Sequence, residues 1–394
     1  MKAKAPLLTT QFLLLCAVLF LTYCNIALFF QFSPYLISLG ISPAAAGVII
    51  GLFALTALVV RPIISPLVHP GVARKWLVVG TIGVIGGLIC YSLTTSLVGL
   101  ALVRVVHGAF YCVLATAVMA IAVALIPPGR SGEAFGLISV ITLLPYAVLP
   151  PMVPALSRIM GGLPRVLVAA AVVMGGVLVV AKWLRPPVEH TTEAARLKWA
   201  EAWRGLLVMP VGGLMVLCLV VFGAFAPLFY FLKPFGTHIG VSNPGWFFTL
   251  STFTEMAVRV VGGRAFDRLN KWWLLCGSLA GLGVCYGLLV NVGPGAGFIL
   301  LGLGFGICWG VALPMLNALI FDFSPPRLRA FNANMTMQML QGGFFLGPVV
   351  AGWVIAGWGY GVVFWGCAVM MLLSAIWAGW AGWRLLQEES CAGN

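Results

Sequence analysis

Three ionisable residues lie inside runs of the sequence that are apolar enough to cross a membrane: Arg104, His107 and Glu255. A charged side chain in the hydrocarbon region costs several kcal/mol unless it is paired or hydrated, and such residues mark solute and ion pathways. The chemistry that they suggest is recognition of a polar solute and transfer of a proton.

Glu255 is the carboxylate that the sequence places deepest within a span, and Arg259 follows it by one helical turn. Burial disfavours the charged form of a carboxylate, whereas a neighbouring guanidinium favours it. A group held between these influences can take up and release a proton, so we expect Glu255 to carry a driving proton. The alternative is a structural pair that only neutralises charge along the helix.

Arg104 and His107 are three residues apart and are therefore neighbours on one helix. The spans of the same half of the chain contain no acidic residue that neutralises Arg104. We therefore expect Arg104 to bind or sense an anionic or polar part of the solute, and we interpret His107 as a hydrogen-bonded packing residue.

The amino-acid composition indicates that much of the protein surface is in contact with lipid. Of the 394 residues, 62% are hydrophobic and 8% are charged, whereas soluble domains carry about 25% charged residues. The net charge of +13 lies in short gaps between apolar runs. This pattern indicates membrane orientation and argues against nucleic acid as a partner.

A helix needs about 20 apolar residues to cross the hydrocarbon core. We therefore expect an all-α integral membrane protein with twelve transmembrane helices. The expected spans are residues 11–32, 45–64, 76–93, 97–126, 134–154, 163–183, 206–232, 245–266, 272–292, 298–321, 331–357 and 361–383. The first run is too long for a signal peptide and is expected to be retained.

Most of the 22 Lys and Arg residues fall on one side of these spans. Short cytoplasmic loops are enriched in Lys and Arg. We therefore expect a multi-pass protein of the cytoplasmic (inner) membrane with both termini in the cytoplasm.

A displacement of 198 residues relates the two halves of the chain. It takes Arg61 to Arg259 and Gly108 to Gly306, and it also relates two Pro-Pro pairs. Such repeats are typical of transporters. We expect two pseudo-symmetric six-helix bundles and a cytoplasmic connector, at residues 1–184, 206–394 and 185–205 respectively.

A polar loop occurs once in each half of the repeat. The first copy contains Arg61, and the second contains Arg259, Asp267 and Arg268. A carboxylate near a helix end attracts guanidinium groups, and partly exposed pairs contribute up to about 1 kcal/mol each. We expect these four residues to form a gating latch that biases one of two helix arrangements. The alternative is that the charges only enforce topology.

Two six-span halves with paired polar loops resemble the major facilitator superfamily over nearly the whole chain. Its loop signature, Gly-x-Leu-x-Asp-Arg-x-Gly-Arg-Arg, is similar to the stretch from Gly263 to Lys271. The first copy departs from it, with Ser65 in place of Gly and His69 in place of Asp. Arg104 begins a stretch that resembles the family's Arg-x-x-x-Gly signature in span 4.

The resemblance implies that spans 1, 4, 7 and 10 line a central cavity. The expected solute-binding residues are therefore Asn25, Arg104, Trp309 and Asn317. The alternative for each polar residue is a hydrogen bond between helices, worth about 0.6 kcal/mol on average in a membrane.

Catalytic signatures are missing from the sequence, which has no HExxH, GxSxG or Walker A motif and no cluster of metal ligands. Its ten cysteines are scattered singly, without a CxxC pair, and are interpreted as packing residues. We expect no enzymatic activity, no catalytic residue, no cofactor and no metal.

Without an ATP-binding loop, transport must use a gradient or run downhill. We expect a monomeric secondary active transporter that moves a small organic solute by alternating access, coupled to protons. Export is favoured over the alternative, uptake of a small metabolite by proton symport. The antiporter-like pattern at Gly343, Gly347 and Pro348 lies in span 11 instead of the family's span 5. A membrane-embedded enzyme or sensor is the second alternative.

Overall fold

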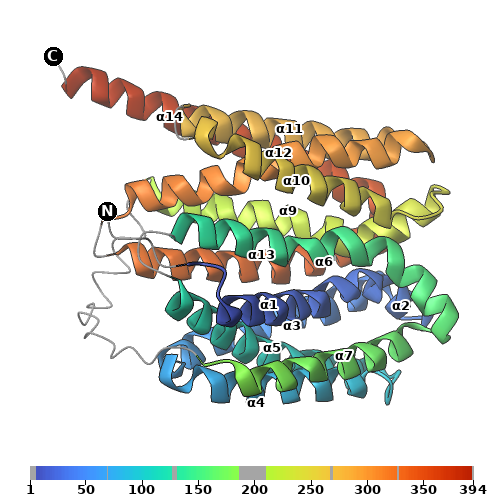
Figure 1. The fold of residues 1–394 in the computed structure, drawn as a ribbon. Helices are drawn as coiled ribbons and strands as arrows, with labels where there is room; N and C mark the ends of the chain where they lie inside the picture. Colours follow the sequence, from blue (N-terminus) through green and yellow to red (C-terminus); the bar gives the residue numbers. More distant parts are fainter. Residues whose placement is uncertain are drawn as a thin grey trace. The chain divides into compact units, whose positions relative to one another are not determined.

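The chain is helical throughout the part that the structure describes. The computed structural model describes residues 6–68, 70–126, 131–185, 210–266, 269–325 and 328–392. Within these ranges there is no β-strand (Figure 1). Eleven of the described helices are long and apolar enough to cross a membrane. The expected all-α membrane fold is confirmed.

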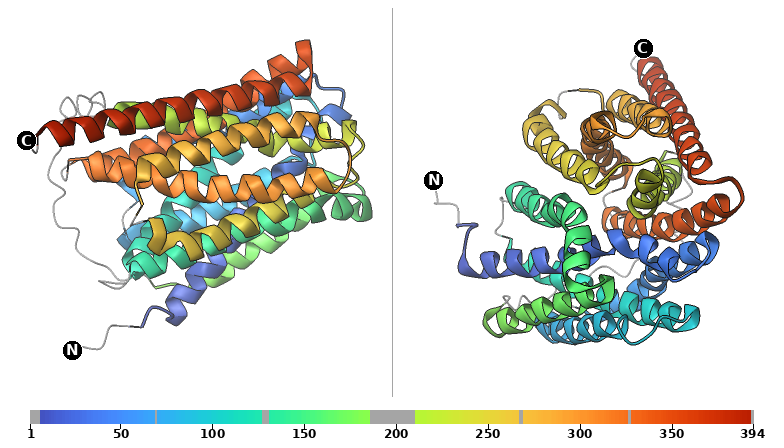
Figure 2. Two further views of the ribbon diagram at one scale, coloured as in Figure 1. Left: turned by 90° about the horizontal axis from the view of Figure 1, so that it is seen from above. Right: turned by 90° about the vertical axis from the view of Figure 1, so that its right-hand side faces the viewer.

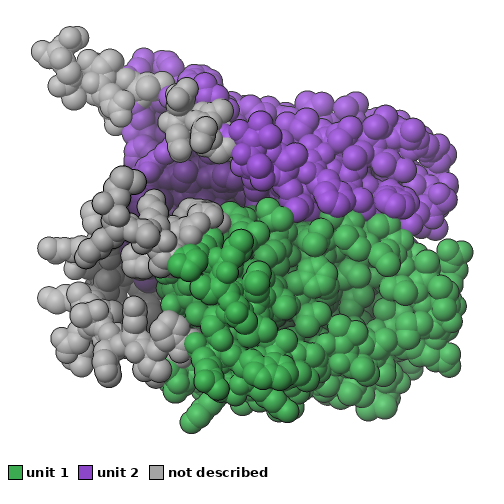
Figure 3. All heavy atoms as spheres, in the orientation of Figure 1, with its two compact units in different colours: residues 1–194 green, residues 195–394 purple. Residues whose placement is uncertain are grey.

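The chain divides into two compact units, residues 1–194 and 195–394 (Figure 3). The helices of the first unit are α1 (Thr10–Ala27), η1 (Leu28–Gln31), α2 (Phe32–Ser38), α3 (Pro43–Ile64), η2 (Ser65–Leu67), α4 (Pro70–Cys90), α5 (Leu97–Leu125), α6 (Ser131–Met160) and α7 (Leu163–Trp183). Those of the second unit are α9 (Val211–His238), α10 (Gly245–Phe266), α11 (Lys271–Asn291), α12 (Ala296–Phe323), α13 (Arg329–Trp358) and α14 (Tyr360–Ala392). Within each unit the long helices run side by side as a bundle (Figure 2).

Helix α10 differs in composition from the eleven apolar helices. It contains 22 residues, which is long enough to span the hydrocarbon core. However, it carries the buried residues Ser251, Thr252 and Glu255, and also Arg259. Of these polar residues, Glu255 and Arg259 are among those that the sequence predicted to carry function.

Several expected spans are shorter than the observed helices. The first was expected to end at residue 32, but α1, η1 and α2 continue to Ser38, because a tight 3-10 turn joins two α-helices without a break. Gly40, at φ 79°, then turns the chain toward α3. At the other end of the chain, α14 continues to Ala392. Its last turns are polar, so hydropathy does not predict them as part of a membrane span although they are helical. The expected connector lies almost entirely outside the described residues.

The 198-residue repeat reappears in how the helices pack. In the first unit, a Cβ added to Gly108 on α5 would lie 2.8 Å from the carbonyl oxygen of Phe53 on α3. In the second unit, a Cβ at Gly306 on α12 would collide with the carbonyl oxygen of Ser251 on α10. Phe53 and Ser251 are themselves 198 residues apart. The α3–α5 and α10–α12 pairs thus use the same close backbone approach.

Candidate functional site

Arg104 is enclosed by aromatic rings in the first unit. Its side chain is 1% exposed. Its Cζ atom lies 4.4 Å from the ring centroid of Phe29, 4.9 Å from that of Phe32 and 4.6 Å from that of Phe53. A cation over an aromatic face gains about 2 kcal/mol when it is desolvated. The rings from η1, α2 and α3 therefore offset part of the cost of burying the charge.

His107 joins the same group of side chains one turn further along α5. Asn25 Nδ2 lies 3.1 Å from His107 Nε2, and the hydroxyl of Tyr91 lies 3.3 Å from Nδ1. Because an amide nitrogen can only donate, Nε2 accepts in this arrangement, and a neutral ring then donates from Nδ1 to Tyr91. The expectation of a hydrogen-bonded packing residue agrees with this geometry.

The shared rings make one cluster of these residues. Phe29 and Phe53 contact both the Arg104 guanidinium and the His107 ring. We call this the Arg104 cluster, and its members are Asn25, Phe29, Phe32, Phe53, Tyr91, Arg104 and His107. Two of the expected solute-binding residues, Asn25 and Arg104, therefore lie together. Asn25 Oδ1 is buried and has no hydrogen-bond partner among the described residues.

In the second unit, Glu255 and Arg259 form an ion pair along α10. The Arg259 Nη2 to Glu255 Oε1 distance is 2.5 Å, and Glu255 is 4% exposed. Helix α12 approaches α10 closely at this position, because a Cβ at Gly310 would lie 3.2 Å from the Glu255 Cα. The Glu255 carboxylate thus lies beside the Arg259 guanidinium, where α12 packs against α10. If the carboxylate gained a proton, this ion pair would be lost.

Trp309 lies in a stack of rings from α9, α12 and α13. Its ring is nearly parallel to that of Phe225, at 4.4 Å between centroids, and to that of Phe305, at 5.8 Å. Phe222 and Phe344 complete the set through edge and tilted contacts. We call these five residues the Trp309 stack. Trp309 is buried, whereas Phe222, Phe225 and Phe344 are half-buried.

Asn317, the fourth expected solute-binding residue, does not join the Trp309 stack. It is exposed on α12, about 12 Å along the helix axis from Trp309 at 1.5 Å per residue. Of the four expected residues, Asn25 and Arg104 thus lie in the Arg104 cluster, Trp309 lies in the Trp309 stack, and Asn317 lies in neither.

The expected latch is described only in part. Arg61 lies in the last turn of α3. Arg259 pairs with Glu255, as the structural alternative anticipated. Asp267 and Arg268 lie outside the described residues.

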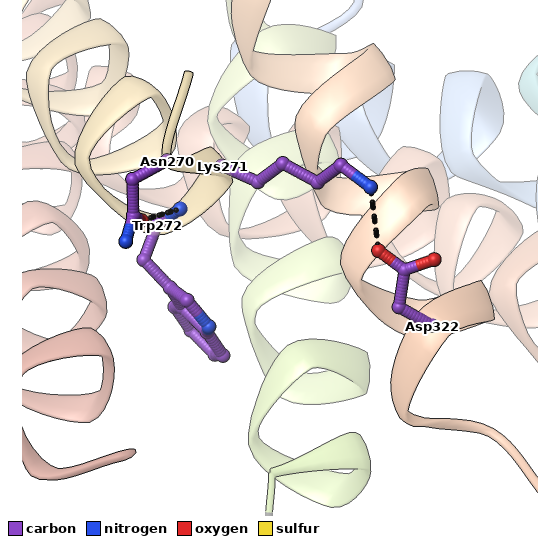
Figure 4. A network of polar contacts seen from close by, with 4 residues as sticks. All are labelled: Asn270, Lys271, Trp272 and Asp322. Carbon is purple, nitrogen blue, oxygen red and sulfur yellow. Dashed lines mark hydrogen bonds and ion pairs between the residues drawn. The ribbon is translucent and has the colours of Figure 1, made fainter. Parts of the chain in front are cut away.

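A second ion pair was not anticipated from the sequence. Lys271 Nζ donates to Asp322 Oδ2 at 2.6 Å, which joins the start of α11 to the end of α12 (Figure 4). Asn270 caps α11, and its Oδ1 accepts from the backbone N–H of Trp272 at 2.9 Å. The paired side chains lie at the same end of a helical hairpin, which is the signal that could have revealed them. They also line a pocket of about 310 Å³ between α11, α12 and α14.

No metal centre is found among the described residues, in which no three His, Cys, Asp or Glu side chains are grouped closely enough to hold an ion. The described sites offer cation–π contact, ring stacking, hydrogen bonding and an ionisable carboxyl group at Glu255.

Comparison with known proteins gives one family and one fold. A sequence model of the Major Facilitator Superfamily matches residues 15–342 and 245–390. No curated protein sequence matches the chain.

Among solved structures, a point mutant of the nucleoside transporter NupG shares 14% identity, with a TM-score of 0.77 over 94% of this chain and 100% of that one. A bacterial homologue of the human lysosomal transporter Spinster, solved in an inward-facing and unoccupied conformation, shares 16% identity. Its TM-score is 0.78, over 98% of this chain and 99% of that one. At this level of identity the likeness is one of fold. Because the family model matches well over half of the sequence, the chain belongs to the Major Facilitator Superfamily and is a multi-pass membrane transporter.

Proposed function

We propose that this transporter exports a small organic solute across the cytoplasmic membrane in exchange for protons, by alternating access, with both termini in the cytoplasm. The observation that carries the proposal is the buried carboxylate of Glu255 in α10, which is paired with the half-buried Arg259. An ionisable group inside a membrane helix costs free energy, so its presence calls for a role.

Protonation of Glu255 is the coupling step in this proposal. As a carboxylate, Glu255 attracts Arg259 and holds the pair together. A proton on the carboxyl group removes that attraction and leaves the guanidinium to find other acceptors. Because Gly310 brings α12 against the Glu255 backbone, a change in this pair alters the contact between α10 and α12.

The Trp309 stack supports a solute with a ring or another flat apolar part. Its half-buried members Phe222, Phe225 and Phe344 offer ring faces, which favour offset stacking with other aromatic groups. One structural neighbour is a nucleoside transporter, so nucleosides belong among the solutes to be tested. Asn317 remains a proposed polar contact on the same helix as Trp309.

Arg104 has a narrower proposed role than the sequence suggested. Three phenyl rings cover its guanidinium, so an anionic or polar part of the solute meets it only where the rings are displaced. In the arrangement described, Arg104 acts by holding η1, α2 and α3 around α5, and Asn25 joins α1 to α5 through His107.

The latch remains a proposal for Arg61, Arg259, Asp267 and Arg268. The Lys271–Asp322 pair supports it, since it places an ionic contact directly after the same loop. A partly exposed pair of this kind contributes up to about 1 kcal/mol, which is weak enough to open during each transport cycle.

The proposed function is tested by solute-dependent proton movement in proteoliposomes. The purified protein is reconstituted with a pH-sensitive dye inside, and solutes are screened by class, with and without aromatic rings. Proton movement opposite to the solute supports export by antiport, whereas movement in the same direction supports uptake by symport. Transport of an identified solute without any proton movement would refute the proposed coupling.

A further inference from the structure

Two short sequence patterns of the same kind face each other in the second unit. Helix α11 contains Gly281 and Cys285, and α12 contains Gly304 and Cys308, so each helix has a glycine one turn before a cysteine. The two helices are consecutive and lie side by side (Figure 1). Because their connection is short, they run antiparallel.

Each cysteine lies over the glycine of the opposite helix. A Cβ added to Gly281 would lie 2.5 Å from Cys308 Sγ, and a Cβ added to Gly304 would lie 3.2 Å from Cys285 Sγ. A step of four residues forward on α11, from Gly281 to Cys285, is matched by a step of four residues back on α12, from Cys308 to Gly304. This is the register expected of an antiparallel hairpin. The absent glycine side chains thus leave the space that the two thiols fill.

The two thiols converge because of helix direction. Side chains on an α-helix lean toward its N-terminus. Since α11 and α12 run in opposite directions, Cys285 leans toward the level of Cys308, and Cys308 leans back toward Cys285. The two thiols consequently lean toward each other across the contact between α11 and α12. Both cysteines are half-buried and free of disulfides.

The thiol pair is not needed for packing in this fold. The residues 198 positions before Gly281 and Cys308 are Gly83 and Phe110. In the first unit the Phe110 ring fills the space over Gly83. The equivalent helix contact is therefore made there by an aromatic ring without sulfur.

We infer that Cys285 and Cys308 form a dithiol site that binds one soft, thiophilic centre across α11 and α12, of which trivalent arsenic is the representative. Thiolate sulfur is a soft ligand that prefers soft centres to hard cations. Among the described residues no third His, Cys, Asp or Glu completes a metal cluster at this position. Two sulfurs suit a centre that forms two bonds to the protein better than tetrahedral zinc, which takes four ligands.

The binding reaction requires no oxidant. An organoarsenical oxide reacts with both thiols, so that two As–S bonds form and the As–O double bond is broken. The two thiol protons leave with the oxygen as water, and no electrons are transferred. Cys308 precedes Trp309 in the sequence, so a bound centre would fix α12 to α11 beside the Trp309 stack.

The site can be tested on the purified full-length protein in detergent, independently of any transported solute. Phenylarsine oxide is added, the mass of the intact protein is measured, and each cysteine is then probed with a maleimide and mapped by peptide mass. We expect one adduct, loss of maleimide labelling at both Cys285 and Cys308, and recovery of labelling after addition of a small competing dithiol.

Variants separate the pair from single thiols. Cys285→Ser and Cys308→Ser should each lose the adduct. The matched control is Cys276→Ser, because Cys276 is also a half-buried cysteine of α11 and lies 3.2 Å from a Cβ position at Gly379 of α14, where no cysteine opposes it. This control should keep the adduct.

Two results would overturn the inference. One is an adduct that survives in Cys308→Ser, and the other is a failure to form an adduct while both thiols of the unmodified protein still react with maleimide. If a serine variant does not fold, peptide mapping of the unmodified protein decides the question. The arsenic atom must then bridge the peptides that contain Cys285 and Cys308, and a bridge between any other cysteines contradicts the site.

Discussion

The two units accommodate an arginine inside the helix bundle in different ways. In the first, the Arg104 guanidinium is surrounded by the rings of Phe29, Phe32 and Phe53. In the second, Arg259 is paired with the carboxylate of Glu255. A phenyl ring has no ionisable group, whereas a carboxylate can be neutralised by a proton. The second arrangement therefore contains a carboxylate that a proton can neutralise.

The repeat shows that this difference is specific to each unit. The position equivalent to Glu255 in the first unit is Ala57, and the position equivalent to Arg104 in the second is Gly302. A Cβ at Gly302 would lie 2.5 Å from a backbone oxygen of α10, so no side chain fits there. The shared backbone packing supplies the scaffold, and among the described residues Arg104 is buried in the first unit and Glu255 in the second.

A large effect is expected from removal of the charge in the Arg104 cluster. Arg104→Met keeps an unbranched side chain within the ring cage but removes the cation and its desolvation cost. We expect the folded yield to be unchanged or higher, while transport falls by about tenfold or more, equivalent to about 1.4 kcal/mol of lost transition-state stabilisation. Initial rates in proteoliposomes, normalised to folded protein, measure this.

Arg104→Lys is the control that keeps the charge in a different shape. Lys is a compact cation without the planar guanidinium, so it should restore part of the transport. Wild-type transport by Arg104→Met would mean that the residue serves packing alone.

The repeated backbone contact predicts matched losses of stability in the two units. Gly306→Ala and Gly108→Ala place a Cβ against the carbonyl oxygens of Ser251 and Phe53. Overpacking of this kind costs about 1–3 kcal/mol. Thermal unfolding in detergent should show a lower Tm for both variants.

Gly277→Ala and Gly86→Ala are the controls, because a Cβ at either position meets no atom within 4 Å. Alanine stabilises a helix relative to glycine by about 0.5–1 kcal/mol, so these variants should melt at the wild-type temperature or above it. A loss confined to one unit would break the equivalence of the α3–α5 and α10–α12 contacts.

A smaller effect is expected from the His107 hydrogen bonds. Tyr91→Phe removes the hydroxyl that lies 3.3 Å from Nδ1 and keeps the ring contacts with Phe29 and Phe32. A net hydrogen bond is worth about 0.5–1.5 kcal/mol, so the Tm should fall slightly and transport should persist. Abolished transport in a stable Tyr91→Phe protein would instead assign a functional role to His107.

The smallest effect is expected from the Lys271–Asp322 pair. Lys271→Gln removes an ion pair whose side chains are 29% and 45% exposed, so the loss of stability should stay below about 1 kcal/mol. The difference in Tm from wild type should disappear at about 1 M salt, where the screening length is about 3 Å. A difference that persists at high salt would mean that Lys271 contributes by packing.

Much of the fold could be predicted from the sequence, because a bilayer imposes helices of a fixed minimum length. The Glu255–Arg259 contact could also be predicted from the sequence, since residues four apart on a helix are neighbours. Helix ends such as Ser38 and Ala392 could not be predicted. They depend on turn geometry and on polar residues that a search for apolar spans leaves out.

The environment of Arg104 could not be predicted for a different reason. A carboxylate is the partner expected for a buried cation, whereas the compensation here comes from phenyl rings on three other segments, and Phe29 and Phe53 are far from Arg104 in the sequence. An ordinary Phe in an apolar run carries no sign that it faces a cation. Similarly, the exposure of Asn317 depends on the rotation of α12, which spacing alone does not fix.

The most direct test of the central claim compares two activities of the Glu255→Gln protein in proteoliposomes. Proton-gradient-driven solute movement and gradient-free solute exchange are measured on the same preparation, with the folded yield recorded beside them. If Glu255 carries the driving proton, the driven movement is lost while exchange and folded yield persist. Transport that still depends fully on the pH gradient in a well-folded Glu255→Gln protein would contradict the account. A joint fall of yield and both activities would show that the pair with Arg259 is structural.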